Sequence, residues 1–204
     1  MPLKAPTITS LVYFGNLWHY RSLHQPAAQL EYHEHFIPQT AHSQCYINTS
    51  QGLLCLSLPV IRARKTGSKT LITDVLLFEE KRHKTRHLRS LTTAYKNSPF
   101  FEYYEQDLKT LYQTESIYLY AWNFSCMQFV IKNLRTRPTF QPTLNYSKDY
   151  LHDFRVDQPT PPIPPSMEFS STFPLQNYNK ISILDWLFHT PISTLRSFIL
   201  QENT

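Results

Sequence analysis

The chain has 204 residues, of which 41% are hydrophobic and 14% aromatic, and it carries a formal net charge of +5. Because only 17% of the residues are charged, general disorder is excluded, and the length suits one domain with a sizeable core. We therefore expect a single domain over residues 1–204.

The positive charge is concentrated in the middle of the chain. Residues 62–96 contain ten Lys and Arg residues but only three acidic ones. A partner of this region is expected to be anionic, such as a sugar nucleotide, an acyl carrier or a nucleic acid. Charge alone does not choose among these partners.

The N-terminal residues show no long apolar run before a small-residue cleavage site, so we expect no signal peptide and a cytoplasmic protein. The most apolar window, residues 117–134, is interrupted by polar side chains and is short for a bilayer span, which predicts a core helix instead. Three cysteines, Cys45, Cys55 and Cys126, have no metal-binding spacing, and their odd number leaves at least one unpaired. We expect three reduced thiols.

The chain opens with the pattern of an α/β unit. Residues 7–14 (TITSLVYF) predict a strand, Gly15 and Asn16 a turn, and residues 17–24 a short helix. The turn lacks the spaced glycines of a dinucleotide-binding fingerprint, so Gly15 is expected simply to permit the turn.

Residues 29–36 (QLEYHEHF) predict a second strand, with Glu31, His33 and His35 on one face. Two His and one Glu can bind a metal, but the sequence supplies no well-spaced further ligand. Hydrogen bonding is the favoured interpretation of this face, and we predict no metal site.

Residues 45–48 and 53–60 predict a hairpin, because two β-rich runs flank a short polar loop that ends in glycine. In this register Cys45 and Cys55 lie on opposite faces and cannot pair with each other. A further strand is predicted over residues 71–78 (LITDVLLF).

The sequence predicts a helix over residues 81–97 whose apolar and basic side chains lie on two different faces. Its apolar face carries Leu88, Leu91 and Tyr95 at the three-and-four spacing of a helix. A second face could hold an anion by forked hydrogen bonds, or be a solvated basic surface. This basic face comprises Arg82, Arg86, Arg89 and Lys96, and a row of His83, His87, Ser90 and Asn97 lies beside it.

Ser98 and Pro99 predict the end of this helix and the start of another, with Ser98 as its N-cap. The second helix is acidic and aromatic where a DNA-recognition helix would be basic. Residues 137–175 are rich in proline and predict a loop or arm within the domain.

The C-terminal region recovers a helical pattern. Ser182 and Asp185 have the spacing of a capping box, and Thr190-Pro191 can start a final helix that ends near Leu200. The elements together predict a mixed α/β fold: a small sheet from the N-terminal strands and a hairpin, packed by a helical middle region and a C-terminal helix.

Several of these stretches together resemble the WbqC-like protein family of bacteria, over nearly the whole chain. They are YFGN before an aromatic helix, EHF before a hairpin that begins CYI, LSLPV, RHLRSLTTAYKNSPFFEYYEQDL and ISILDWLF. The resemblance implies a role in the synthesis of surface polysaccharides such as O-antigens, by attachment of an acyl or aminoacyl group to an amino sugar or sugar nucleotide.

The resemblance also implies which polar positions matter, and where this chain departs from the family. The family-type residues are Asn16, Glu34, Gln39, His87, Arg89, Tyr95, Lys96, Asn97 and Asp185. Pro38 replaces a usual lysine, His42-Ser43-Gln44 replaces Arg-Asn-Arg, and Leu88 replaces a tryptophan. This member is therefore divergent and could be inactive, although a protonated His42 would restore part of the charge.

Acyl transfer to an amine needs a base, oxyanion donors and a cationic cradle for phosphate. We expect His87 or Glu34 as the base and Arg86, Arg89 and Lys96 as the cradle, with Asn16, Tyr95 and Asn97 in the binding site. They would meet in a cleft roofed by the helix over residues 81–97. Cys45 is favoured as a structural thiol over a nucleophile, and Asp185 as a capping residue over a catalytic acid.

A transferase is the favoured class, and no cofactor follows from the sequence. A scaffold of an envelope assembly is the next alternative, because cationic family motifs are missing. A nucleic-acid-binding protein is the least favoured, because acidic residues directly follow the basic helix and no known nucleic-acid module is present.

Overall fold

The structure is a computed structural model that describes residues 6–62, 69–148, 150–156, 158–162 and 178–201. The described elements are, in chain order, β1 (Thr7–Ser10), α1 (Leu17–Leu23), β2 (Ala28–Glu31), β3 (Gln44–Thr49), β4 (Gly52–Ser57), β5 (Val60–Ile61), η1 (Ile72–Asp74), β6 (Leu76–Leu77), α2 (Glu80–Tyr95), α3 (Phe101–Gln113), α4 (Leu119–Leu134), β7 (Phe140–Pro142), β8 (His152–Phe154), η3 (Tyr178–Lys180), α5 (Ile183–His189) and α6 (Ile192–Ile199).

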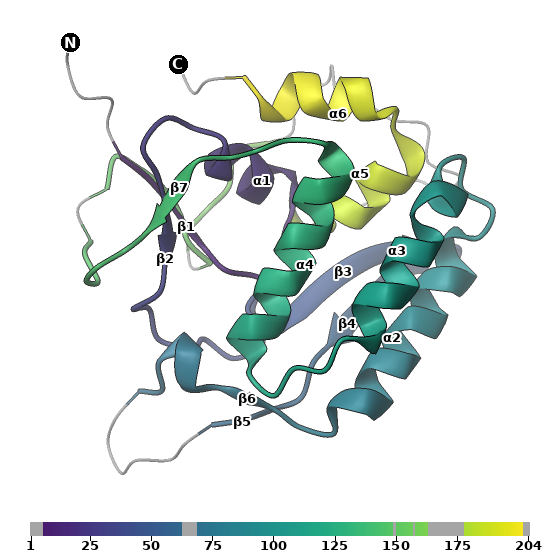
Figure 1. Cartoon of the computed structure of the whole chain (residues 1–204), viewed down its shortest axis with the longest axis horizontal. Helices are drawn as coiled ribbons and strands as arrows, with labels where there is room; N and C mark the ends of the chain where they lie inside the picture. Colours follow the sequence, from purple (N-terminus) through teal and green to yellow (C-terminus); the bar gives the residue numbers. More distant parts are fainter. Residues whose placement is uncertain (1–5, 63–68, 149, 157, 163–177, 202–204) are drawn as a thin grey trace.

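The mixed α/β fold predicted from the sequence is confirmed. A parallel sheet with the strand order β7-β2-β1-β8 lies at the left of Figure 1, α2 and α3 lie at the right, and α4 lies between them. The antiparallel hairpin β3–β4 forms a separate sheet. The interior is one apolar cluster to which α4 contributes Trp122, Cys126 and Met127, so this helix is the core helix that was predicted.

The central strand β1 is buried at every position, because β2 and β8 pair with its two edges. It is shorter than the predicted strand over residues 7–14, because the chain leaves the sheet after Ser10. The N–H of Tyr13 then donates to the Ala41 carbonyl at 2.9 Å. The helix α1 follows as predicted.

Two predicted strands are wrong in part, because local hydrogen bonds take the place of hydrogen bonds to a neighbouring strand. The strand β2 ends at Glu31, and the next two N–H groups donate to the Thr143 hydroxyl and to the Glu31 carboxylate. The predicted strand over residues 71–78 begins as the 3₁₀ helix η1, and only β6 pairs with β5. The hairpin β3–β4 is confirmed, with Asn48 opposite Leu53 as expected.

The proline-rich segment is not wholly a loop. It supplies β7 and β8, which form the two outer strands of the parallel sheet. Pro142 is tolerated in β7 because an outer strand has one unpaired edge, where a missing N–H removes no ladder bond. Residues 149, 157 and 163–175 of this segment lie outside the described residues.

The helix α2 turns its predicted basic face to solvent. Arg82, Arg86, Arg89 and Lys96 are exposed, whereas the opposite face buries Lys84, His87, Leu91 and Tyr95. The burial of Lys84 is compensated: its ammonium contacts Glu80, donates to the Thr114 carbonyl at 2.6 Å and lies 3.7 Å from the Trp122 ring centroid. This cation therefore ties α2 to the start of α4.

The corner after α2 and the start of α5 differ in detail from the prediction. Ser98 does not cap α3; its hydroxyl lies 3.0 Å from His189 Nε2. Ser182 does cap α5, since its Oγ accepts from the Leu184 N–H at 3.2 Å. The reciprocal half of the capping box is missing, because the Ser182 N–H donates to the Tyr46 carbonyl. The final helix α6 follows Pro191 as predicted.

Asp185 faces the interior and joins α5 to β3. Its carboxylate accepts from the Asn48 N–H at 3.2 Å, and the side chain is fully buried. Burial raises its pKa from 3.8 to about 7, although hydrogen bonds from Tyr95 and Asn48 act in the opposite direction.

This pKa predicts how stability depends on pH. A carboxyl with a higher pKa in the folded chain stabilises the fold fully below its unfolded pKa, and the effect is lost as the pH rises through about 7. Between pH 5 and 8 the free energy of unfolding should fall by about 2–3 kcal/mol relative to that of Asp185→Asn, at about 1.4 kcal/mol per unit. Urea unfolding of both proteins at each pH measures this difference.

The buried His19 and His87 have lowered pKa values and act in the opposite direction, but both proteins share them and their effects cancel. A difference that does not change with pH would show that Asp185 is ionised in the folded protein.

Candidate functional site

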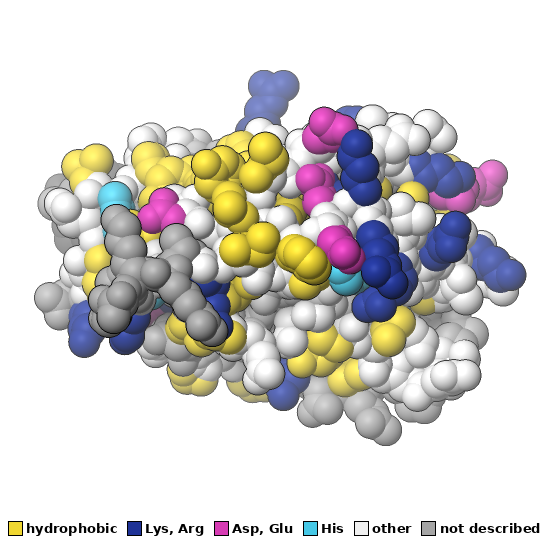
Figure 2. All heavy atoms as spheres, turned by 90° about the horizontal axis from the view of Figure 1, so that it is seen from below, with side chains coloured by type: hydrophobic (Ala, Val, Ile, Leu, Met, Phe, Trp, Pro, Cys, Tyr) yellow, Lys and Arg dark blue, Asp and Glu magenta, His cyan; other side chains and the backbone are white. Residues whose placement is uncertain are grey.

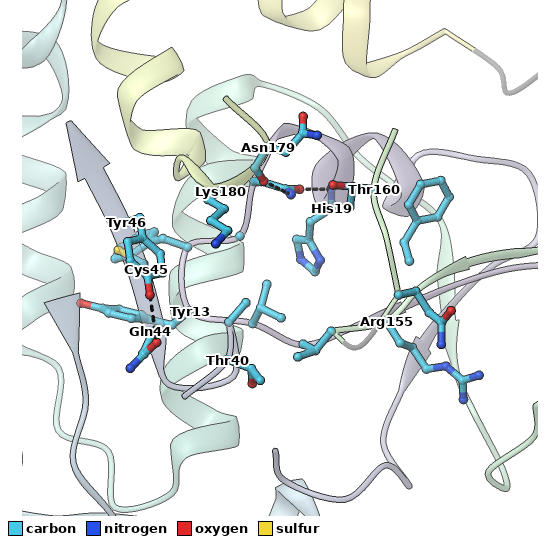
Figure 3. Close-up of a pocket in the computed structure, with 18 of the residues that line it drawn as sticks. Tyr13, His19, Thr40, Gln44, Cys45, Tyr46, Arg155, Thr160, Asn179 and Lys180 are labelled. Atoms are coloured by element: carbon cyan, nitrogen blue, oxygen red, sulfur yellow. Dashed lines mark hydrogen bonds between the residues drawn. The ribbon is translucent and has the colours of Figure 1, made fainter. Parts of the chain in front are cut away.

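A cavity of about 530 Å³ opens beyond the ends of β1 and β8, which are neighbouring parallel strands (Figure 3). Ligands of parallel sheets gather at this edge, beyond the carboxyl ends of the strands. The start of β3 and the η3 turn complete the wall. The lining polar side chains are mainly amides and hydroxyls: Asn16, Gln39, Thr40, Gln44, Gln158, Thr160 and Asn179.

The turn after β1 builds the inner wall. A Cβ atom on Gly15 would lie 2.5 Å from Val12 Cγ2 and 2.9 Å from the His19 ring, so glycine is required by close approach. Asn16, a predicted site residue, does line the cavity and also caps α1: its Oδ1 accepts from the His19 N–H at 3.0 Å. Its Nδ2 donates to the Asn179 carbonyl at 2.8 Å, which ties α1 to η3.

His19 is a cavity residue that the sequence did not reveal. It is 5% exposed, and its Nδ1 lies 2.9 Å from the Thr9 hydroxyl oxygen. Its Nε2 has no hydrogen-bond partner among the described residues. Burial lowers its pKa from 6.5 to about 3, so the ring is neutral at pH 7. Neither helical nor strand periodicity singles out this histidine, because it is brought to Thr9 only by the turn at Gly15.

Few charges face the cavity. The guanidinium of Arg155 is held by Asp153, with Nε 3.0 Å from Oδ1, and donates from Nη1 to the Ser147 carbonyl at 2.7 Å. Figure 3 shows this side chain pointing away from the cavity, whereas Lys180 extends towards it. Among the described lining residues, Lys180 is the cation without an ion pair.

Glu34, a predicted base, does not line the cavity. Its Oε2 accepts from the Ser10 hydroxyl at 2.7 Å, and its Oε1 lies 3.1 Å from His42 Nε2. Because the Ile37 N–H donates to His42 Nδ1, the proton of a neutral imidazole lies on Nε2, the atom that faces Glu34 Oε1. The carboxylate thus joins β1 to the loop before β3. His42 is fully buried in this contact and does not face the cavity.

His87, the other predicted base, is also buried. Its Nδ1 lies 2.9 Å from the Tyr13 hydroxyl oxygen, which is 2.7 Å from that of Tyr112. Burial, with smaller effects from Arg86 and His83, lowers its pKa from 6.5 to about 4. Tyr13 lines the cavity, but Figure 3 shows its hydroxyl pointing away, so the Tyr13 ring lies between the cavity and His87.

The predicted cationic cradle is not at this cavity. Arg86, Arg89, Lys96 and Asn97 are exposed, and no residue of α2 lines the cavity. The prediction that α2 roofs the site therefore does not hold for this cavity, because the helix turns His87 and Tyr95 towards the core. Figure 2 shows basic side chains gathered on the side of the molecule where α2 lies. Their contact with substrate remains a prediction.

Cys45 is a structural thiol by its surroundings. It is 3% exposed, and burial, with nearby Asp185, raises the pKa of its thiol. Only a thiolate is an effective nucleophile, so this environment does not activate Cys45. Cys55 lies on the other face of the hairpin, opposite Tyr46, and is half-buried.

The thiols should therefore react in a fixed order. In the native protein, a thiol reagent such as DTNB should modify Cys55 first, and Cys45 and Cys126 only at the rate of unfolding. Under non-reducing denaturing conditions all three thiols should titrate. A count of one would contradict the hairpin register and the expected reducing compartment.

The close approach at Gly15 is testable by substitution. Gly15→Ala should lower the free energy of unfolding by about 1–3 kcal/mol, because the new methyl group overlaps Val12 and the His19 ring. Adding Val12→Ala should recover part of this loss, which urea unfolding of the single and double variants measures. Strictly additive losses would show that the contact with Val12 is not the cause.

The chain belongs to the WbqC-like protein family, whose model matches residues 30–156, more than half of the 204 residues. No curated protein and no solved structure matches the chain. The matched segment supplies the Gln39–Tyr46 wall and Arg155, whereas His19 and Lys180 lie outside it. Among the described residues, no helix is long and apolar enough to cross a membrane.

Proposed function

We propose that this protein acts in the biosynthesis of a bacterial surface polysaccharide and binds an amino sugar or its nucleotide in the cavity, for transfer of an acyl or aminoacyl group. Family membership supports the general role. The observation that carries the assignment of the site is the cavity lining of amides and hydroxyls with little charge. We place this activity in the cytoplasm.

The lining suits a sugar for two physical reasons. Side-chain amides and hydroxyls can each donate and accept, which matches the mixed donor and acceptor character of sugar hydroxyls. Tyr46 and Phe154 add aromatic surface against which the apolar face of a sugar ring can pack. The volume is within the range of about 300–1,000 Å³ that is usual for small-molecule sites.

The charge distribution supports an orientation for the ligand. Lys180 is exposed and points towards the cavity, so it can meet a phosphate group at the opening. Among the described residues, the inner wall near His19 carries no cation, because the imidazole is neutral at pH 7, so this wall suits the uncharged part of the ligand. The sugar would therefore lie inside and the phosphate outside.

A non-catalytic sugar-binding scaffold is the second candidate. It is favoured by the burial of the predicted bases, since Glu34 and His87 are both engaged by neighbouring side chains. The two candidates share the ligand and differ in turnover: a transferase produces an N-acylated sugar from an activated acyl donor, and a scaffold does not. The exposed face of α2 would serve a nucleic acid or another anion, with affinity that falls steeply with salt.

Calorimetric titration with nucleoside-diphosphate amino sugars tests the site. Lys180→Gln should weaken binding of the nucleotide sugar about tenfold, or about 1.4 kcal/mol, and leave binding of the free sugar unchanged. Arg89→Lys tests the exposed face of α2, because it replaces the forked guanidinium donors by a single ammonium group. It should leave the affinity for the nucleotide sugar unchanged if the cavity is the site. The reverse result, a tenfold loss with Arg89→Lys only, would place the site on α2.

A further inference from the structure

Among the described residues that line the cavity, His19 is the one with a buried side-chain nitrogen that has no hydrogen-bond partner. It is 95% buried, yet its Nε2 has no partner among the described residues, and Figure 3 shows the ring directed into the cavity. A buried polar atom without a partner is destabilising, and a ligand group in the cavity would satisfy this one. The space is preserved by Gly15, since any side chain there would overlap the His19 ring.

The contact with Thr9 decides which atom carries the proton. The Thr9 hydroxyl is fully buried, and its hydrogen-bond partner among the described residues is His19 Nδ1 at 2.9 Å. If Nδ1–H donated instead, the Thr9 proton would be left without an acceptor in the core. Donation from Thr9 satisfies both groups, and it places the single ring proton of the neutral imidazole on Nε2.

We propose that His19 is the specificity residue of the cavity, and that its Nε2–H donates to an uncharged ligand oxygen, the carbonyl oxygen of an N-acyl group on the sugar. This inference rests on the proposed function, because it assumes that a sugar occupies the cavity. A neutral donor at this place favours an acyl oxygen over an ammonium group, which has no acceptor to offer. The cavity thereby binds the N-acylated sugar, which is the product of the proposed transfer, more tightly than the free amine that is its acceptor.

The ring stays a donor over the whole working range of pH. With a pKa of about 3, His19 is neutral from pH 5 to 8, so its preference should not follow an imidazole titration in that range. It is also too weakly basic to take a proton from an ammonium group efficiently. His19 is thus a binding and positioning residue for the acyl oxygen.

The test compares two nucleotide sugars that differ only at the nitrogen: uridine-diphosphate glucosamine and uridine-diphosphate N-acetylglucosamine. At pH 6 the wild type should bind the N-acetyl form at least about tenfold more tightly, or about 1.4 kcal/mol. His19→Phe keeps a flat ring without the N–H and should abolish the preference. His19→Gln places a side-chain N–H at similar reach and should retain part of it.

Two controls separate this role from a structural one. His35→Phe changes an exposed histidine outside the cavity and should keep the full preference. Thr9→Val removes the hydroxyl that fixes the ring proton, without changing the cavity lining, and should reduce the preference. Nitrogen-15 spectra of the wild-type ring should show a neutral imidazole protonated at Nε2, whose signal moves on addition of the N-acetyl sugar.

The outcomes are distinguishable. Equal binding of both sugars, or a preference that survives His19→Phe, overturns the role of His19 and leaves the proposed function standing. A ring protonated at Nδ1 overturns the donor assignment without any ligand and also if His19→Phe fails to fold. Absence of binding of either sugar overturns the proposed function, and with it this inference.

Discussion

The hydroxyl group of Ser10 joins three segments that are far apart in the sequence. It donates to Glu34 in the loop after β2 and accepts from the N–H of Val156 beyond β8. The residue is fully buried at the end of the central strand, where an unpaired hydroxyl would cost about 1–3 kcal/mol. The loop after β2 and the segment after β8 are therefore drawn to the same point, and the cavity lies directly beyond it.

The same constraint acts one residue earlier in β1. Thr9 is buried and finds its partner in His19, so the position of α1 follows from the polar content of a strand that has no contact with water. Threonine and serine suit a pleated strand and still require hydrogen-bond partners there. The hydrogen-bond partners that buried Thr9 and Ser10 require thus fix the segments that form the cavity wall. The amide-rich side chains of these segments face the cavity.

How far the sequence predicts the fold depends on the range of the interactions involved. The β3–β4 hairpin and α4 follow from short-range patterns, and both were predicted within a few residues. The strands β7 and β8 have three residues each, too few to show a period, and they form only because β2 and β1 offer free edges. Their pairing is set by the sheet and not by their own composition.

The site was predicted less well than the fold, for a related reason. The helical spacing of α2 correctly placed its arginines on one face, but it could not show that His87 and Lys84 belong to the opposite, buried face. A histidine or lysine is assigned to solvent unless a partner is known, and the partners, Tyr13 and the Thr114 carbonyl, come from distant segments. Asn16 was predicted from the family resemblance and from its place in the turn after the first strand, which is a local feature.

The order of strands in the parallel sheet also bears on the order in which the protein can assemble during synthesis. Among the described elements of the parallel sheet, β1 is synthesised before its partners, and it can pair early with β2 through the short α1 connection. Its other edge is covered only by β8, after more than 140 further residues have been made. Until then one edge of β1 in the nascent chain is unpaired, and an unpaired strand edge is a template for wrong pairing. A truncated chain that ends before β8 would keep that edge permanently, and we expect such fragments to depend on chaperones or to aggregate.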